Sequence, residues 1–201
     1  ILFFCISSRV VEEIEEIPND SLVIFSAHGV SSKVEEETKS RNLNFFYATC
    51  PLVTKVHMEV RKHANAEKDI ILIGHEGHPE VEGTMGRHVN SANSSIYLVQ
   101  DEDDALSIKV NKENQLAVVT QTTLSVDETK SIISILKNRF PEILIPKKDD
   151  ICYATQNRQD AVKQLALESD FMIVVGSKNS SNSNRLKELG EKCGCKSVLI
   201  D

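Results

Sequence analysis

Short runs of β-branched and aromatic residues alternate with longer amphipathic stretches along most of this sequence. Five runs have the length of a strand, and they cover residues 22–25, 45–48, 70–73, 117–119 and 171–175. In the stretch that opens at Pro51, Val53, Val56, Val60 and Ala64 recur three to four residues apart, which predicts a helix with one buried face. Alternating strands and helices predict an α/β architecture whose mostly parallel sheets are buried on both faces.

The composition argues against several classes of protein. With 201 residues, 40% hydrophobic and 26% charged, the chain is long enough for one complete domain and parts of others. The formal net charge of -7 argues against a nucleic-acid partner, because such proteins gather lysines and arginines against phosphates. No apolar run approaches the roughly 20 residues that cross a bilayer, so we expect no membrane association. The five cysteines lack the spacing of a disulfide framework, which favours a reducing compartment.

Prolines and charged residues mark the expected boundaries between units. Pro141, Pro146 and the charged residues 147–150 interrupt the helical periodicity, and a second boundary falls near Pro51. We therefore predict a remnant of a first α/β domain at 1–50, a complete second domain at 51–148 and a partial third domain at 149–201. Too few residues lie outside the middle segment to complete a sheet on either side, which predicts an internal fragment of a longer protein.

Chemically distinctive residues collect in the loops that follow the predicted strands. Because parallel strands end at a common edge of a sheet, these loops can share one site. They hold His28, Cys50, His75, His78, Glu80, Thr122, Cys152 and the hydroxyl and amide residues 180–184. The 180–184 loop opens a helix, so its N–H groups and side chains can bind an anion such as a diphosphate. His28 and His78 would add donors, charged where protonated, and Glu80 is the carboxylate predicted to carry a proton.

Each of these residues also has an ordinary structural explanation. A cysteine at a strand end is usually a small buried apolar residue. His75 and His78 can be surface loop residues, and the serines and asparagines of 180–184 can act only in a turn and a helix cap. These explanations weaken when all the residues must meet at one edge by coincidence.

The cysteine spacing does not match a structural zinc site. Zinc needs close pairs of ligands, whereas Cys193 and Cys195 are separated by one residue and Cys50 and Cys152 by about a hundred. Cys193 also falls on the apolar stripe of the last predicted helix, so we expect it in the core. Single cysteines from separate units fit an iron–sulfur cluster held between them.

Six sequence motifs follow one another in a fixed order. They are IFSAHGV at 24–30, ATCPLVTKVH at 48–57, GHEGHPEVEGT at 74–84, TQTTLS at 120–125, ICYATQNR at 151–158 and VVGSKNSSNSN at 174–184. Together they closely resemble the family called IspH or LytB, the 4-hydroxy-3-methylbut-2-enyl diphosphate reductases. The resemblance runs from about Val10 to Asp201 and is too extensive for chance agreement.

This resemblance implies a particular fold and cofactor. The family has a trefoil of three small parallel-sheet α/β domains around a central [4Fe-4S] cluster, which is held by one cysteine from each domain. Cys50 and Cys152 would be two of these ligands. The remaining open iron would bind the substrate hydroxyl as a Lewis acid.

The resemblance also implies a reaction and its participants. The diphosphate would be held by His28, His78, Ser180, Ser181 and Asn182. Thr122 would contact the substrate hydroxyl, and Glu80 would deliver the proton with which that hydroxyl leaves as water. Two electrons from a ferredoxin or flavodoxin would complete the reduction to isopentenyl and dimethylallyl diphosphates in the non-mevalonate isoprenoid pathway. Such an enzyme would act in the bacterial cytoplasm or in the plastid stroma.

The chain departs from the family pattern at both ends. The third cluster cysteine and an early diphosphate histidine have no counterpart, because Cys5 and its neighbours in 1–9 do not match the family's first motif. A late diphosphate serine is also absent, so we expect the isolated chain to be inactive. Two other functions stay open. One is a non-catalytic diphosphate-binding α/β module with Cys50 and Cys152 in its core, and the other is a zinc hydrolase that uses the loop histidines.

Overall fold

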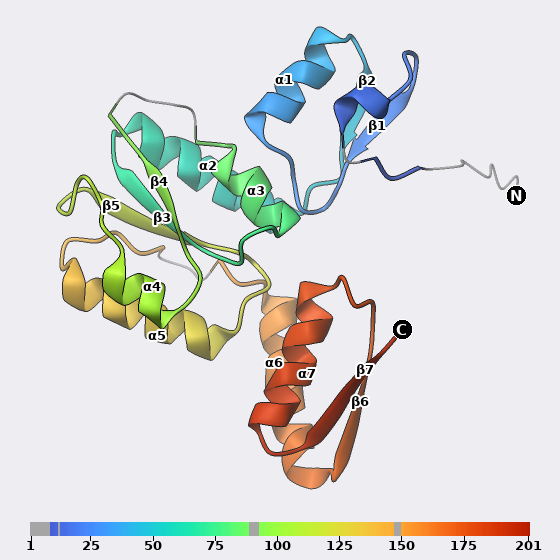
Figure 1. Cartoon of the computed structure of the whole chain (residues 1–201), viewed down its shortest axis with the longest axis vertical. Coiled ribbons are helices and arrows are strands. Elements are labelled where there is room, and N and C mark those ends of the chain that lie inside the picture. The colour runs from blue at the N-terminus through green and yellow to red at the C-terminus, as the bar shows by residue number, and fades with distance from the viewer. Residues whose placement is uncertain (1–8, 12, 89–92, 147–149) are drawn as a thin grey trace, which may run out of the picture.

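The chain forms three parallel sheets, each accompanied by helices (Figure 1). The computed structural model describes all residues except 1–8, 12, 89–92 and 147–149. The α/β class with parallel sheets is thereby confirmed. None of the helices in the described part is long and apolar enough to cross a membrane.

The elements follow one another in three groups along the chain. The first group holds a 3-10 turn η1 (Ile14–Glu16), β1 (Leu22–Phe25), α1 (Ser32–Ser40) and β2 (Asn44–Tyr47). The second holds α2 (Pro51–Asn65), β3 (Asp69–Ile73), α3 (Pro79–Met85), β4 (Ile96–Val99), α4 (Glu102–Ser107), β5 (Leu116–Thr120) and α5 (Val126–Arg139). The third holds α6 (Tyr153–Glu168), β6 (Phe171–Val175), α7 (Ser181–Lys192) and β7 (Lys196–Ile200). β4 and β7 were not among the predicted strands, because short apolar runs do not distinguish strand from helix by period alone.

The middle sheet is buried on both faces. In β3, Ile70 and Leu72 pack with residues of α2 and α3, whereas Ile71 and Ile73 pack with residues of α4 and α5. The alternation follows from the two-residue period of a strand. Each of these side chains is fully buried, which stabilises the fold by ~1.5–3 kcal/mol apiece. This three-layer unit therefore supplies a rigid platform for the loops at its edge.

The strand order places a binding crevice at a defined point of the middle sheet. The order is β4-β3-β5, so the chain leaves β3 in one direction to form β4 and then crosses over to form β5 on the other side. α3 packs on one face of the sheet and α4 on the opposite face. Open parallel sheets bind ligands where the strand order reverses in this way. The loops after β3 and β5 flank that point.

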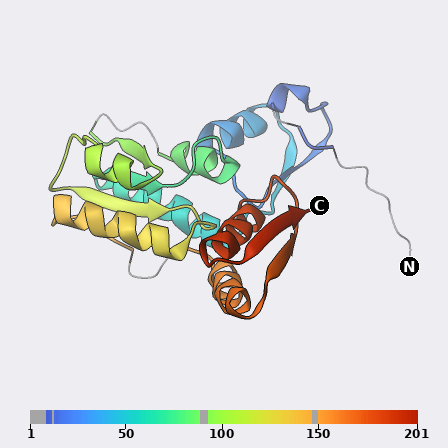
Figure 2. The same ribbon diagram turned by 60° about the horizontal axis from the view of Figure 1, so that its bottom comes forward.

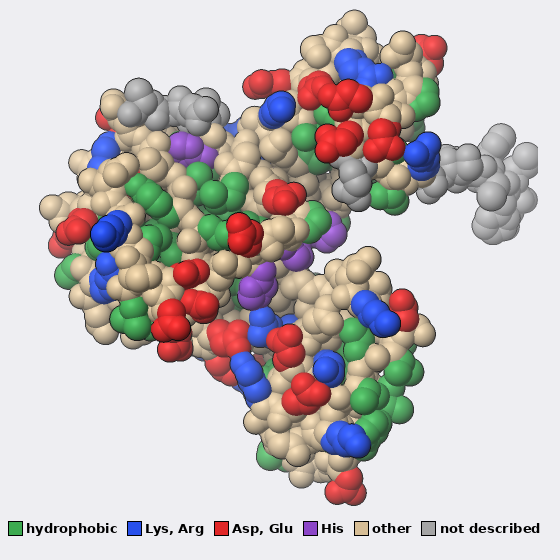
Figure 3. Space-filling view, viewed as in Figure 1, with side chains coloured by type: hydrophobic (Ala, Val, Ile, Leu, Met, Phe, Trp, Pro, Cys, Tyr) green, Lys and Arg blue, Asp and Glu red, His purple; other side chains and the backbone are tan. Residues whose placement is uncertain are grey.

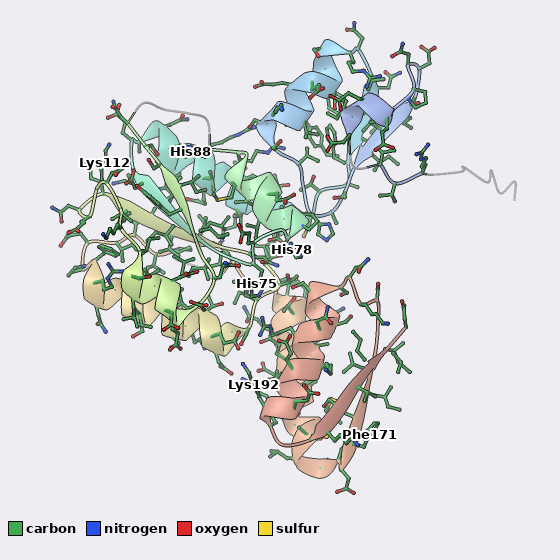
Figure 4. All side chains as sticks on the ribbon, in the orientation of Figure 1. His75, His78, His88, Lys112, Phe171 and Lys192 are labelled. Carbon is green, nitrogen blue, oxygen red and sulfur yellow. The ribbon has the colours of Figure 1, made fainter. Side chains whose placement is uncertain are left out.

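The two outer sheets differ from the expectation that both faces are buried. α6 and α7 cover one face of β6 and β7, and Figures 1 and 2 show the strands open on the other side. On that face Phe171, Ile173 and Val175 are 46%, 56% and 76% exposed, and Figure 4 shows Phe171 at the outer edge. Leu22 and Ile24 of β1 are exposed in the same alternating way. With two strands each in the described part, these sheets have a helical cover on one side only.

The prediction that Cys193 lies in the core is wrong. Cys193 ends α7 and is exposed, whereas Cys195 is buried against α6 and β6. Between them Gly194 has a φ of +86°, a left-handed conformation that suits glycine. This turn reverses the chain at the end of the helix, and it therefore brings the second cysteine, rather than the first, into the core.

Candidate functional site

The loops that carry the predicted site residues meet between the three sheets. Figure 4 shows His75 and His78 at the junction of the middle unit with the beginning of α7. In Figure 3 most of the visible histidine surface lies at this junction, beside a hollow between the upper and lower parts of the molecule. The loops after β1, β3, β5 and β6 contribute to this region, where His28 contacts His78 and Thr123 contacts Ser181.

A buried carboxylate lies at the reversal point of the middle sheet. Glu80, in the first turn of α3, is 2% exposed, and its Oε1 accepts a hydrogen bond from the Thr122 backbone N–H at 2.6 Å. Its Oε2 accepts a second from Thr122 Oγ1 at 3.0 Å. Burial raises the pKa of Glu80, and the two hydrogen bonds from Thr122 oppose this rise. The predicted proton carrier and the predicted hydroxyl contact are thus directly joined.

Cys152 is attached to the same threonine through the backbone. Its N–H donates to the Thr122 carbonyl oxygen at 2.9 Å, and Cys152 is the N-cap of α6. Cys50 holds the corresponding position at α2, and its N–H donates to the carbonyl oxygen of Ala27, next to His28. Each cysteine therefore begins a helix beside a loop that carries a predicted substrate contact.

Both thiols fit the ligand role of an iron–sulfur cluster. Cys50 and Cys152 are unpaired and half-buried, and neither side chain forms a cap hydrogen bond with its helix. A helix N-terminus favours the negative charge of a ligating thiolate. In the described part of the chain no group of three or more histidine, cysteine or acidic side chains is placed to hold a metal ion. Cys5 lies outside the described residues.

An ion pair with a buried carboxylate joins α2 to the segment just before α6. Lys55 Nζ lies 2.8 Å from Asp150 Oδ1, and the Asp150 side chain has no exposed surface. Asp150 Oδ2 also accepts from the Thr120 backbone N–H at 3.3 Å. Burial raises the pKa of Asp150, and the Lys55 ammonium counteracts that rise. In the sequence Asp150 belongs to the charged boundary run 147–150, which gives no sign of this link.

His78 caps α3 as a neutral side chain. Its Nδ1 accepts a hydrogen bond from the Glu80 backbone N–H at 3.1 Å, which leaves Nε2 as the protonated, donating nitrogen. Burial, reinforced by His28 and His75, lowers the pKa of His78 to about 4. The rings of His28 and His78 lie edge to face, with centroids 5.5 Å apart. His78 is thus a neutral donor near pH 7, and His28 is the exposed member of the pair.

The loop that carries His28 depends on Gly29 for its backbone conformation and for its close approach to His57. Gly29 has a φ of +77°, and a Cβ at this position would lie 2.4 Å from Cε1 of the buried His57. Burial lowers the pKa of His57 to about 4, and the positive charge of Arg87 adds to this effect. His57 Nε2 has no hydrogen-bond partner among the described residues. Nothing in the sequence pattern distinguished His57 as a functional residue.

The start of α7 offers polar groups toward the middle unit. Ser180 is the N-cap, and its Oγ accepts from the Ser183 N–H at 3.3 Å. Ser181 Oγ accepts from Thr123 Oγ1 at 3.2 Å, which ties this loop to the residue after Thr122. The Oδ1 atom of Asn182 is buried and has no hydrogen-bond partner in the described part of the chain. A buried amide oxygen without a partner is an acceptor and calls for a donor, from a ligand or from water.

A pocket of about 530 Å³ lies between the loop after β3 and α7. Its described lining residues are His75, Glu76, Gly77, His78, Pro79, Asn179, Ser181, Asn184, Arg185 and Glu188. Of the predicted site residues, His78 and Ser181 line it directly, while Glu80 is linked to it through His78. Cys50 and Cys152 are not part of its lining.

The fold and the site together define a class of protein. It is a parallel α/β protein with a polar pocket, a buried glutamate side chain and two single thiols in the loops between its sheets. A family model described as "LytB protein" matches residues 6–201, and the chain belongs to this family. The match begins slightly before the predicted start near Val10.

Curated relatives carry the name 4-hydroxy-3-methylbut-2-enyl diphosphate reductase. The Alcanivorax borkumensis protein is 62% identical over 191 residues, which cover 95% of this chain and 61% of the relative. The Pseudomonas putida and Methylococcus capsulatus proteins are 61% and 59% identical, with the same coverage. The chain thus spans about three fifths of the length of these relatives.

A solved structure shares the arrangement of most of this chain. The E-1-hydroxy-2-methyl-but-2-enyl-4-diphosphate reductase from Plasmodium falciparum aligns with a TM-score of 0.87 at 38% identity. The alignment covers 95% of this chain and 59% of that one. A second reductase structure, titled the terminal enzyme of the non-mevalonate pathway, aligns with a TM-score of 0.63 at 30% identity over 94% of this chain and 66% of that one.

Proposed function

We propose that this chain carries the diphosphate-binding and proton-donating part of a 4-hydroxy-3-methylbut-2-enyl diphosphate reductase. The observation that carries the proposal is the hydrogen-bonded contact between the buried Glu80 and Thr122. Thr122 in turn accepts a hydrogen bond from the Cys152 N–H, so the three residues form one connected group. The names of its relatives support the same reaction. The predicted site residues keep in this proposal the roles that the resemblance implied.

The substrate's diphosphate would bind between two loops. Ser180, Ser181 and Asn182 lie at the N-terminus of α7, whose N–H groups favour an anion. His78 would donate from Nε2, since its Nδ1 is occupied by the helix cap, and His28 would donate from the adjoining loop. Hydroxyl, amide and neutral imidazole donors suit a phosphate in a chain of net charge -7.

Glu80 would supply the proton for loss of the hydroxyl. Its raised pKa favours the protonated form, which is the form that can donate. Protonation lets the carbon–oxygen bond of the allylic alcohol break, so that the oxygen leaves as water. Two electrons and a second proton then give isopentenyl or dimethylallyl diphosphate. Thr122 Oγ1, hydrogen-bonded to Glu80, would orient the hydroxyl group for this transfer.

Cys50 and Cys152 would hold an iron–sulfur cluster of the [4Fe-4S] type, with further ligation from outside the described residues. When bound, such a cluster supplies electrons and a Lewis-acidic iron at the substrate hydroxyl. An external one-electron carrier, a ferredoxin or flavodoxin, would reduce it. We place the enzyme in the bacterial cytoplasm or the plastid stroma, where thiols stay reduced.

The test replaces Glu80 in a version of the chain extended to the length of its relatives. In Glu80→Gln the amide oxygen can still accept from the Thr122 N–H, and the NH₂ group can donate to Thr122 Oγ1, so the local geometry persists. We expect turnover to fall by roughly two to four orders of magnitude, with cluster spectrum and diphosphate affinity unchanged.

Glu82→Gln is the matched control, because Glu82 lies on the same helix and is exposed. It should keep wild-type turnover. Turnover of Glu80→Gln within a few-fold of wild type would exclude the proton-donor role. An extended protein that binds diphosphate but neither holds iron nor turns over would instead be the non-catalytic module.

A further inference from the structure

The two halves of the pocket belong to different parts of the chain, and Arg185 connects them. Arg185 lies in α7, and its Nη2 is 3.0 Å from Nε2 of His75, in the loop after β3. Its Nη1 lies 2.9 Å from Glu128 Oε2 at the start of α5 and 2.9 Å from Glu188 Oε2. The Arg185 side chain is 14% exposed. One guanidinium therefore links three segments of the structure.

The chemistry of the contact fixes the state of His75. A guanidinium has only donors, so His75 Nε2 must accept, and the neutral imidazole then carries its proton on Nδ1. Burial and the nearby charge of Arg185 lower the pKa of His75, with Glu128 and Glu188 opposing the change. Neutral His75 and cationic Arg185 are thus the compatible states near pH 7.

The contact closes a ring of hydrogen bonds around the pocket. The His75 backbone N–H donates to Gln121 Oε1 at 3.1 Å, and Gln121 Nε2 donates to Thr123 Oγ1 at 3.0 Å. Thr123 Oγ1 in turn donates to Ser181 Oγ at 3.2 Å. Ser181 and Arg185 lie about one turn apart on α7, and Arg185 returns to His75. The ring leaves few ways for the two loops to move independently.

Charge gives Arg185 a second effect on the pocket. Glu76 and Glu188 line the pocket, and Glu128 lies behind Arg185. Among the described lining residues, Arg185 is the one with a permanent positive charge. Carboxylates without a counter-ion would repel a diphosphate at this range. The ion pairs of Arg185 with Glu128 and Glu188 reduce that repulsion. The guanidinium stays hydrogen-bonded to these carboxylates and to His75.

We propose that Arg185, through His75, is a positioning residue that sets His78 and Ser181 on opposite sides of one diphosphate. The proposal rests on the proposed function, since it assigns the pocket to the diphosphate of that substrate. Arg185 acts through His75 and the two carboxylates and does not take part in bond breaking. Its loss should therefore weaken anion binding and leave the chemical step intact.

The experiment measures binding of inorganic diphosphate by calorimetry, and KM and kcat, in the chain extended to the length of its relatives. Arg185→Ala should weaken diphosphate binding and raise KM about tenfold to a hundredfold, as expected for loss of a charged hydrogen bond, with kcat within a few-fold of wild type. Lys187→Ala is the control, because Lys187 lies on the same helix and pairs with Glu191 of that helix. It should change neither quantity.

A second pair of variants tests the link itself and does not depend on how Arg185→Ala folds. His75→Gln keeps an acceptor for Arg185 and should bind diphosphate nearly as wild type does, whereas His75→Leu should resemble Arg185→Ala. The double variant should be no worse than Arg185→Ala, because Arg185→Ala has already removed the contact that His75→Leu removes.

The outcomes separate the two proposals. If His75→Leu and Arg185→Ala bind diphosphate as tightly as wild type, the positioning role is wrong while the proposed function stands. A fall in kcat without a change in KM would also contradict the role. If the extended wild-type protein does not bind diphosphate at all, the proposed function and the positioning role both fail.

Discussion

Replacing Thr122 with valine isolates one of the two hydrogen bonds that hold Glu80. Valine has nearly the shape of threonine and keeps the backbone N–H that donates to Oε1 at 2.6 Å, but it lacks the hydroxyl that donates to Oε2 at 3.0 Å. The Thr122 hydroxyl stabilises the ionised carboxylate, so its removal raises the pKa of Glu80 further.

The magnitude follows from the strength of a hydrogen bond to a charged group. Such a bond contributes about 1.5–3 kcal/mol, and a pKa shift of one unit corresponds to about 1.4 kcal/mol. Protonated Glu80 can itself donate to Thr122 Oγ1, which recovers part of this energy in the acid form. We therefore expect the alkaline limb of the rate profile to move by about one pH unit.

The direction of the shift is fixed by the role of Glu80. A general acid is active while protonated, so turnover is present below its pKa and is lost as the pH rises through it. The valine variant should keep its own maximal rate to a higher pH than the wild type. The assay is kcat/KM against pH under anaerobic conditions, with the position of the limb, rather than the absolute rate, as the readout.

Thr122→Ser serves as the control, because it restores the hydroxyl without the methyl group. Its alkaline limb should return to the wild-type position even if substrate binding changes. Identical limbs in all three proteins would mean that Glu80 does not govern the profile, and a limb that moves to lower pH in the valine variant would contradict the electrostatic reasoning.

Three further predictions concern the anion loop, a buried histidine and the chain alone. Alanine at Ser180 and Asn182 should weaken diphosphate binding in calorimetry without changing the cluster spectrum. A diphosphate affinity equal to that of the wild type would mean that the loop only caps its helix. Because burial lowers the pKa of His57 to about 4, its stabilising contribution is complete above its ordinary pKa of 6.5 and falls as the pH drops toward 4. The free energy of unfolding, measured by denaturant titration, should fall by about 2 kcal/mol by about pH 5, and His57→Leu should remove this dependence on pH. The same pH dependence in both proteins would disprove this account of His57. The 201-residue chain expressed alone should aggregate through its exposed sheet faces and hold at most a labile, substoichiometric cluster on Cys50 and Cys152, so four stable irons per chain would refute this.

Local sequence patterns determined the class of fold and much of the candidate site. Alternation of strand-length and helix-length periods predicted parallel α/β units, because each period depends on residues close together in the chain. Pro51 marked the first turn of α2 for the same local reason. Distinctive residues after β3 and β5 could be assigned to one edge because parallel topology brings the strand ends of one sheet together, whereas the meeting of the three sheets depends on the tertiary structure. The roles of Glu80, Thr122 and the two cysteines came from the family resemblance and remain predictions.

Only the tertiary structure decided the state and the partners of these groups. Arg185 and His75 are 110 residues apart, and no local pattern reports such a pair. Asp150 belongs to a charged run that marks a predicted boundary between units, yet its side chain is buried and pairs with Lys55 of α2. His78 looked like a possible cation, but burial and a helix N–H make it a neutral acceptor and donor. Burial, pairing and protonation depend on which distant segments pack together, and the sequence specifies that packing through the whole fold rather than through any one motif.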